Sequence, residues 1–282
     1  MNYCVYGINI SSNIPIHHVN ICENIANLGL NVDYNYKNPK NSSISITQDD
    51  ESVYIDLNPF AQYWIDLKKS EITCSAQNYE SFFSTFFNVP LSSYLILKGE
   101  ILLHASSMIF ADSLICFAGE KGVGKSTLTN LLNGDLLKQY SDDTLRIDYQ
   151  CNGYKGNNLS KLKEDSIEKL CVKGLTGYRN AVGKQYVELN TDFYCRQVRA
   201  LIFISRSNGG VELKKVTSRI LQQTIIFDNI VGLNYFSSNM VKNALKAVNK
   251  INIPVFTLKV PDNLHQLVVM KERLINMILT EV

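Results

Sequence analysis

A nine-residue string in the middle of the chain restricts the fold more than any other feature of the sequence. Residues 119–127 read Gly-Glu-Lys-Gly-Val-Gly-Lys-Ser-Thr, which matches GxxxxGK followed by Ser or Thr at every fixed position. An apolar run, Leu114–Ala118, precedes the string, and a helix-like stretch, Ser126–Leu132, overlaps its end. This order predicts a strand, a phosphate-binding P-loop and a helix, joined by the tight turns that glycines permit.

Each position of this loop has a chemical role in holding a nucleoside triphosphate. Backbone N–H groups of the loop cradle the phosphates, and the helix that follows adds its positive N-terminal dipole. We expect Lys125 to place its charge on the β- and γ-phosphates and Ser126 to be a Mg²⁺ ligand. The predicted nucleotide-binding residues are Gly119, Glu120, Lys121, Gly122, Val123, Gly124, Lys125, Ser126 and Thr127.

Two adjacent acids follow the loop. Asp142 and Asp143 come directly after the strand candidate Leu137–Tyr140. A carboxylate at such a strand end can hold Mg²⁺, usually through water, and a second one can accept a proton from a hydroxyl substrate. The alternative is a solvent-exposed Ser-Asp-Asp-Thr turn. With the P-loop upstream we predict that one of the two acids serves the metal and the other serves the chemistry.

A predicted hairpin leads into the P-loop and carries one histidine. Ile101–Phe110 is predicted to be its first strand, residues 111–113 the turn and Leu114–Ala118 its second strand. His104 lies in the first strand. A single histidine in an apolar strand is more often a satisfied core residue, but the path of the hairpin toward the P-loop favours an active-site role here.

These features together resemble the catalytic core of HPr kinase/phosphorylase. The resemblance rests on Leu103–Ser107 (Leu-His-Ala-Ser-Ser), the P-loop and Ser141-Asp142-Asp143, and covers roughly Gly99–Ser205. The chain looks closer still to HPr-kinase-like peptide serine kinases, which are often encoded with genes for modified-peptide (lasso-type RiPP) biosynthesis. Similar features in those relatives are a Gly-Tyr-rich loop, here 152–156, a short helix, here Lys163–Cys171, and a Gly-Lys pair, here Gly183-Lys184.

The resemblance implies an ATP- and Mg²⁺-dependent kinase that phosphorylates a Ser hydroxyl of a peptide or small protein. Asp143 matches the family's proton acceptor, Asp142 matches its neighbour, and His104 matches an active-site position near the phosphates. The Glu-Ile-Arg-Gly motif of true HPr kinases is absent, which argues against HPr as the substrate and against phosphorylase activity. A later acidic Mg²⁺ ligand therefore has no motif; Glu164, Asp165 and Glu168 are nearby candidates.

Two cations after the acids are further candidates. Arg179 and Lys184 lie in a Gly-rich stretch that could fold over the γ-phosphate. A role as surface cations on a loop is at least as well supported by the residues alone.

The predicted fold class is α/β. An HPr-kinase-like P-loop core over 99–282, with a mixed sheet, the hairpin and flanking helices, follows a small β-rich α/β module over 1–98 that could recognise the substrate. Strand candidates of the module are Tyr3–Ile10, Ser43–Thr47, Ser52–Leu57 and Gln62–Leu67, and its helix candidates are Val19–Leu28 and Tyr79–Phe87, the second stopped by Pro90. Later strand candidates are Leu145–Asp148, Val198–Ile204 and Pro254–Val260, and later helix candidates are Ser218–Val231, Ser237–Ile251 and Asn263–Leu279.

Composition excludes several other classes. A formal net charge of +2 with only short basic runs gives no reason to expect a nucleic-acid partner. We see no secretory signal and no apolar run of roughly 18 residues, so no membrane span is expected and a cytoplasmic location is predicted. The seven scattered cysteines form no CxxC pair, which favours reduced thiols. Whether the chain forms a homo-oligomer stays open.

Two other functions remain compatible with the sequence. One is a nucleotide-switched binding or assembly protein, although the guanine-selective Asn-Lys-x-Asp and the Leu-Ser-Gly-Gly-Gln of transporter ATPases are both absent: residues 249–252 read Asn-Lys-Ile-Asn. The other is a kinase for a free small molecule. The segments expected to select the acceptor, residues 1–98 and the loop 151–184, carry no readable code.

Overall fold

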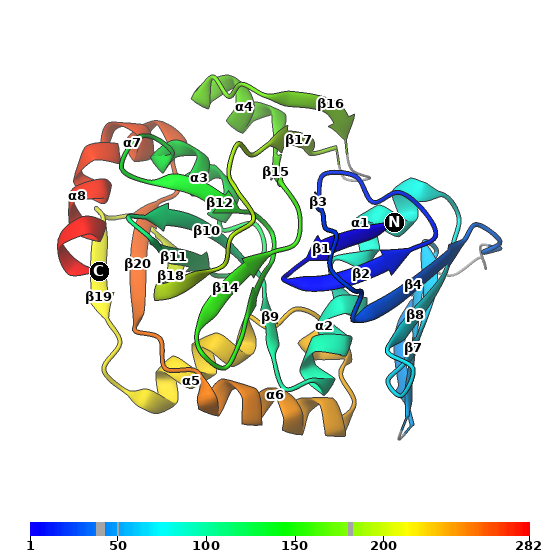
Figure 1. Ribbon diagram of the computed structural model, residues 1–282. Coiled ribbons are helices and arrows are strands. Elements are labelled where there is room, and N and C mark those ends of the chain that lie inside the picture. The colour runs from blue at the N-terminus through cyan, green and yellow to red at the C-terminus, as the bar shows by residue number, and fades with distance from the viewer. Residues whose placement is uncertain (38–42, 50, 180–182) are drawn as a thin grey trace. The chain divides into compact units, whose positions relative to one another are not determined.

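The computed structural model describes residues 1–37, 43–49, 51–179 and 183–282. The chain forms two units, each built from two segments (Figure 1). The first unit consists of Met1–Leu102 and Ile230–Ala247, and the second of Leu103–Asn229 and Val248–Val282. The sequence placed a boundary between residues 98 and 99. It gave no sign that Ile230–Ala247 returns to the first unit.

The first unit is built on an eight-stranded mixed sheet in the order β3-β1-β2-β4-β8-β7-β6-β5. The strand β4 pairs in parallel with β2 and β8, while the other neighbours are antiparallel. Its elements are β1 (Asn2–Val5), β2 (Ile8–Ser12), β3 (Asn20–Ile21), β4 (Leu28–Asp33), β5 (Ser43–Gln48), β6 (Ser52–Asn58), β7 (Ala61–Asp66), β8 (Glu71–Ala76), α1 (Tyr79–Phe86), α2 (Val89–Leu97) and the short 3-10 helix η1 (Leu233–Tyr235).

Two predictions near the N-terminus are wrong. Tyr3–Ile10 is not one strand but the hairpin β1–β2, which reverses at Tyr6 and Gly7, both with positive φ. Two such residues make the turn that suits a two-residue hairpin. Val19–Leu28 is not a helix: β3 pairs with β1, placing Ile21 opposite Tyr3, and Leu28 begins β4. Pairing with strands distant in sequence overrides a weak helical pattern here.

The helix α1 confirms the prediction over Tyr79–Phe87, and the side chain of Asn78 caps it by accepting from the N–H of Ser81 over 2.8 Å. Pro90 was predicted to stop this helix. It lies in the first turn of a second helix, α2, which the sequence did not predict. A proline is tolerated there since the first turn has no N–H partner to lose.

The second unit contains the predicted hairpin and the glycine-rich segment that follows it. Its elements are β10 (Ala105–Phe110), β11 (Ser113–Ala118), α3 (Lys125–Leu132), β12 (Lys138–Ser141), β13 (Leu145–Ile147), β14 (Asn152–Lys155), β15 (Leu159–Leu162), α4 (Glu164–Leu170), β16 (Leu175–Arg179), β17 (Gln185–Glu188), β18 (Arg196–Ser207), β19 (Glu212–Lys215), α5 (Arg219–Asp228), β20 (Val255–Pro261), α7 (Leu264–Val269) and α8 (Lys271–Glu281). Two elements, β9 (Ile101–Leu103) and α6 (Ser238–Lys250), contain residues of both units.

The large mixed sheet has the path β12-β10-β11-β18-β14-β13-β9, with β20 beside β18 and β19 beside β20. The three strands β11, β18 and β20 run parallel, and β10 is antiparallel to β11 and β12. A core of buried side chains that includes Phe117, Leu128, Ile202, Leu258 and Leu274 joins this sheet to the helices α3 and α8. The observed architecture is therefore a mixed α/β fold with flanking helices, as predicted.

Two long predicted elements are interrupted. Ile101–Phe110 is divided into β9 and β10 at His104, whose backbone N–H donates to the carbonyl of Asn229 over 2.8 Å instead of joining the ladder. Asn263–Leu279 is divided into α7 and α8 at Met270. Helical hydrogen bonds from Met270 to Gln266 and from Leu274 to Met270 still cross that junction.

A small three-stranded sheet, β15-β17-β16, lies beside the large one in the second unit and carries α4 (Figure 1). The helix α4 matches the short helix predicted over Lys163–Cys171. Residues 152–156, predicted to be a loop, mostly form the strand β14, because Gly153 and its neighbours pair with β13 and β18.

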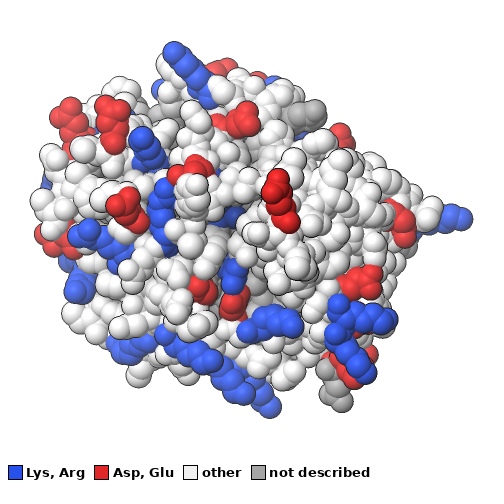
Figure 2. Space-filling view, in the orientation of Figure 1, with Lys and Arg blue, Asp and Glu red and all other residues white. Residues whose placement is uncertain are grey.

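Within the described ranges, the longest helix, α6, has 13 residues, and no helix there has the length and apolar character needed to cross a bilayer. All seven cysteines lie in the described ranges, and none of them forms a disulfide. Figure 2 shows Lys and Arg side chains interspersed with Asp and Glu over the visible face.

Candidate active site around the glycine-rich loop

The glycine-rich loop Gly119–Gly124 connects the end of β11 to the start of α3. Gly119, Gly122 and Gly124 all have positive φ, which side-chain-bearing residues rarely adopt. A Cβ atom on Gly119 would also lie 2.7 Å from the carbonyl oxygen of Ile204. The loop therefore needs glycine for two reasons, the backbone conformation and the close approach of β18.

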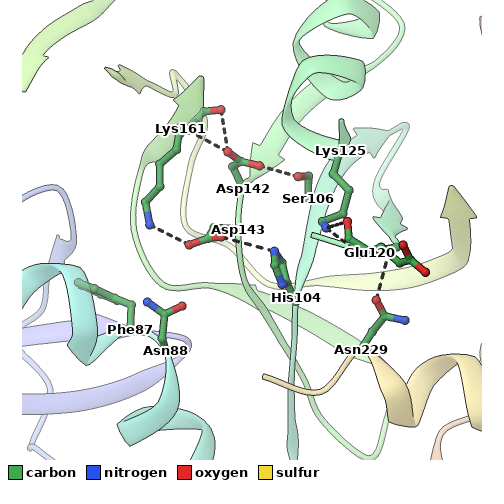
Figure 3. Close-up of polar contacts among 12 residues, drawn as sticks. Phe87, Asn88, His104, Ser106, Glu120, Lys125, Asp142, Asp143, Lys161 and Asn229 are labelled. Carbon is green, nitrogen blue, oxygen red and sulfur yellow. Dashed lines mark hydrogen bonds and ion pairs between the residues drawn. The ribbon is translucent and has the colours of Figure 1, made fainter. Parts of the chain in front are cut away.

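Lys125, the first residue of α3, folds back over this loop. Its Nζ donates to the carbonyl oxygens of Gly119 over 2.8 Å and Glu120 over 3.2 Å (Figure 3). Burial lowers the pKa of Lys125, while the charges of Asp142 and Asp143 oppose that shift. A phosphate at this loop could replace the two carbonyls as the partner of the ammonium group.

Two residues that sequence reasoning missed hold the loop from outside. The Asn229 side chain accepts from the Gly119 N–H over 3.1 Å, and Arg206 donates from Nε to the Val123 carbonyl over 2.7 Å. A Cβ on Gly124 would meet Nη2 of Arg206. Neither residue belongs to a motif, and both lie far along the chain, so no local pattern could reveal them.

The two adjacent acids have different surroundings. Asp142 is only 5% exposed, and both its carboxylate oxygens accept hydrogen bonds. The Ser106 hydroxyl donates to Oδ1, while the Ser160 hydroxyl donates to Oδ2 over 3.0 Å and the Lys161 N–H over 2.9 Å. Asp142 is thus a buried anchor between β10, β12 and β15.

Asp143 projects from a strained turn. Its φ is +70°, and the N–H of Thr144 donates to the carbonyl of Asp142 over 2.8 Å, which is the pattern of a γ-turn. Residues held in such sparsely populated conformations concentrate at functional sites. The turn separates the two carboxylates, leaving Asp142 buried and the side chain of Asp143 33% exposed.

Two cationic or titratable groups lie on opposite sides of Asp143 (Figure 3). His104 Nε2 is 3.7 Å from Oδ1, and Lys161 Nζ is 2.7 Å from Oδ2. Desolvation raises the pKa of Asp143, but the charge and hydrogen bond of Lys161, together with smaller contributions that include the charge of Lys184, outweigh it, so the pKa falls to about 2. Desolvation, assisted by Lys125, lowers the pKa of His104, which leaves its imidazole neutral at pH 7.

The two further cation candidates, Arg179 and Lys184, lie in different surroundings. The charge of Lys184 lowers the pKa of both Lys125 and Asp143, so Lys184 lies near the loop and the acids. Arg179 instead donates to Glu164 over 3.1 Å, and both side chains are more than half exposed. Asp165 pairs with Lys169 over 2.7 Å, so Glu164 and Asp165 are both engaged elsewhere.

The remaining predicted site residues lie on α3 and in the loop. Ser126 and Thr127 are half-buried in the first turn of α3, and the hydroxyls of Thr127 and Ser166 are 3.2 Å apart. Lys121 and Glu120 are exposed. In the described part of the chain, no group of three or more His, Cys, Asp or Glu side chains is arranged to hold a metal ion.

This chain has matches among solved structures but not among family models or curated proteins. No protein-family model matches the chain, and no curated protein does. Among solved structures, 43 chains match, including the Hpr(Ser) kinase/phosphatase from Coxiella burnetii. That match has 14% identity and a TM-score of 0.29, covering 61% of this chain and 96% of that chain. The similarity is too low to assign this chain to that protein's family.

Proposed function

We propose that this chain is an ATP- and Mg²⁺-dependent kinase that transfers the γ-phosphoryl group to a Ser hydroxyl of a peptide or small protein. The observation that carries the proposal is the approach of His104 Nε2 to within 3.7 Å of Asp143 Oδ1, in the unit that holds the glycine-rich loop. Phosphoryl transfer depends mainly on positioning and charge, with cations on the phosphates and a carboxylate at the acceptor hydroxyl.

The donor side fits a triphosphate. The glycine loop and the N-terminus of α3 present backbone N–H groups, and Lys125 supplies the charge for the β- and γ-phosphates. Lys184, whose charge acts on both Lys125 and Asp143, adds a second cation. Since each carbonyl that now accepts from Lys125 is a weaker partner than a phosphate, ATP binding would draw the ammonium group away from them.

The metal would be held by Ser126 and, through water, by Asp142. Three hydrogen bonds already occupy the Asp142 carboxylate, which leaves about one of its four acceptor positions free. Mg²⁺ bound there would neutralise part of the negative charge of the phosphates. Ser126 lies in the first turn of α3, next to the loop, where its hydroxyl would serve as a ligand of the ion.

On the acceptor side, Asp143 is proposed to orient the hydroxyl and to receive its proton as the new O–P bond forms. With a pKa of about 2 the carboxylate is ionised at neutral pH. His104 is neutral at that pH, so it places no positive charge beside the Asp143 carboxylate. The paired acids support a phosphotransferase over a nucleotide-switched binding protein, in which one metal-binding acid is sufficient.

We propose that the acceptor is a Ser-containing precursor peptide of modified-peptide biosynthesis, and that the reaction takes place in the cytoplasm. The net charge of +2 and the interspersed charges of Figure 2 support a peptide or small protein over nucleic acid. The test is to incubate the chain with Mg²⁺, γ-labelled ATP and Ser peptides, and to follow label on the peptide by mass spectrometry. The same peptides with Ser→Ala serve as the substrate control.

The decisive variant is Asp143→Asn, compared with Asp135→Asn as an exposed carboxylate of the same unit. We expect label transfer that Asp143→Asn slows by roughly 10²-fold or more and that Asp135→Asn retains. Transfer at an unchanged rate in Asp143→Asn contradicts the base assignment. Label on a free alcohol but on no peptide favours a small-molecule kinase, and nucleotide-dependent partner binding without any phosphoproduct favours a switch protein.

A further inference from the structure

We infer that Lys161 is a positioning residue that holds Asp143 by one carboxylate oxygen and leaves the other, beside His104, to face the acceptor hydroxyl. The inference rests on the proposed phosphotransferase function. It gives a role to a side chain of the small sheet, outside every motif of the sequence.

Lys161 contacts both adjacent acids (Figure 3). Its backbone N–H donates to Oδ2 of Asp142 over 2.9 Å, and its Nζ donates to Oδ2 of Asp143 over 2.7 Å. Lys161 thus holds the buried Asp142 through its main chain and the partly exposed Asp143 through its side chain. A shift of either carboxylate relative to β15 would break one of these bonds.

The two oxygens of Asp143 are not equivalent. Oδ2 accepts from Lys161 at hydrogen-bond distance, whereas Oδ1 lies 3.7 Å from His104 Nε2, beyond a normal hydrogen bond. The oxygen with acceptor capacity on the His104 side is therefore Oδ1. An acceptor hydroxyl that approaches between His104 and Asp143 meets this oxygen, while Lys161 prevents the carboxylate from turning away.

Lys161 is itself held in place. It lies opposite Tyr186 in the pairing of β15 with β17, and its Nζ is 5.8 Å from the centre of the Tyr186 ring. Its side chain is 20% exposed. Fixing a long lysine side chain costs conformational entropy, and here the strand pairing and the aromatic neighbour restrict it before any substrate binds.

A second ion pair in the same unit provides a matched control. Lys169 Nζ lies 2.7 Å from Asp165 Oδ1, the same separation as in the Lys161–Asp143 pair, but the two side chains are 55% and 67% exposed. Exposed pairs of this kind contribute little to stability. Lys169→Met therefore removes an ion pair of equal length without touching the acids of the site.

The first experiment compares Lys161→Met, Lys161→Arg and Lys169→Met in the full chain. For Lys161→Met we expect kcat to fall on the order of 10²-fold, the loss typical of a misplaced catalytic group, with the Kd for ATP unchanged. Lys161→Arg should recover part of the rate, and Lys169→Met should match the unmodified chain. A rise in the Kd for ATP with kcat retained would overturn the inference, since Lys161 would then bind nucleotide.

The second experiment repeats Lys161→Met in an Asp143→Asn background. If Lys161 acts through Asp143, the double variant should be no slower than Asp143→Asn alone. Rate losses that multiply would show two independent roles and would also overturn the inference.

A measurement without turnover separates this inference from the proposed function. Hydrogen exchange of the Thr144 amide reports the γ-turn at Asp143, and it should become faster in Lys161→Met but not in Lys169→Met. If the chain phosphorylates no acceptor, the proposed function fails while faster exchange still supports the positioning role. Unchanged exchange overturns the positioning role whether or not the chain is a kinase.

Discussion

The side-chain oxygen Oδ1 of Asn229 accepts a hydrogen bond of 3.1 Å from the backbone N–H of Gly119, 110 positions earlier in the sequence. The backbone carbonyl of Asn229 also accepts from His104, so one residue at the end of α5 connects the break between β9 and β10 to the glycine-rich loop. Both N–H groups belong to the candidate site, and neither has a strand partner.

Replacing Asn229 with Ala should therefore destabilise the start of the loop. The buried N–H of Gly119 would lose its acceptor, which costs roughly 1–3 kcal/mol of the free energy of unfolding. Urea denaturation measures this change. Asn229→Asp keeps the acceptor oxygen but, like Asn229→Ala, loses the amide that donates to the Ile225 carbonyl over 2.8 Å. Hydrogen exchange of the Gly119 amide therefore separates the two bonds: it should be faster in Asn229→Ala than in Asn229→Asp, and equal exchange in both variants would contradict the role of the bond to Gly119.

The loop glycines should differ in their tolerance of alanine. At Gly122 a Cβ meets nothing within 4 Å, so Gly122→Ala should cost only the strain of its positive φ, about 1–2 kcal/mol. At Gly119 the new Cβ also meets the Ile204 carbonyl, which should add roughly 1–3 kcal/mol. Thermal or urea unfolding of the two variants checks the order, which would be wrong if Gly122→Ala were the less stable protein.

Asp143→Asn should lower the rate of phosphoryl transfer by roughly 10²–10⁴-fold, the usual contribution of a general base. The affinity for ATP should not fall, because Asp143 is proposed to act on the acceptor. Initial rates with labelled ATP and calorimetric titration of the nucleotide give the two quantities. If the affinity for ATP fell together with the rate, Asp143 would act on the donor side instead.

Lys155 should make stability depend on pH. The side chain is 2% exposed, and burial lowers its pKa from 10.5 to about 7, although Nζ donates to Asn158 and Thr191. Between about pH 7 and 10.5 the unfolded chain thus binds more protons than the folded one. The free energy of unfolding should rise with pH across this window, by at most about 1.4 kcal/mol per pH unit from this group.

Urea denaturation at several pH values between 7 and 10 tests the Lys155 effect. Tyrosines and cysteines also titrate in that range, so the informative quantity is the difference in slope between the chain and Lys155→Met. The slope should be smaller in the variant and unchanged in Lys163→Met, whose lysine is exposed. Equal slopes in all three proteins would contradict the lowered pKa.

Local patterns predicted the elements whose signals lie within a few residues. The hairpin β10–β11, the helix α3 after the glycine loop and the strands β6 and β7 all occur where alternation, turn residues and glycines indicated them. The predictions failed where a distant strand decided the outcome. The stretch Val19–Leu28 has a weak helical period, yet pairing with β1 makes Asn20–Ile21 a strand.

The sequence by itself determined the chemical inventory of this protein: a glycine loop between a strand and a helix, Lys125 at its end and two adjacent acids downstream. Those features are local, because glycine conformations and strand ends are set by neighbouring residues. Only the tertiary structure decided that Asp142 is a buried anchor, that Asp143 is partly exposed, and that Lys161, Asn229 and Arg206 hold the site. Each of these contacts joins residues from separate elements, so their positions follow from sheet pairing and burial rather than from spacing along the chain.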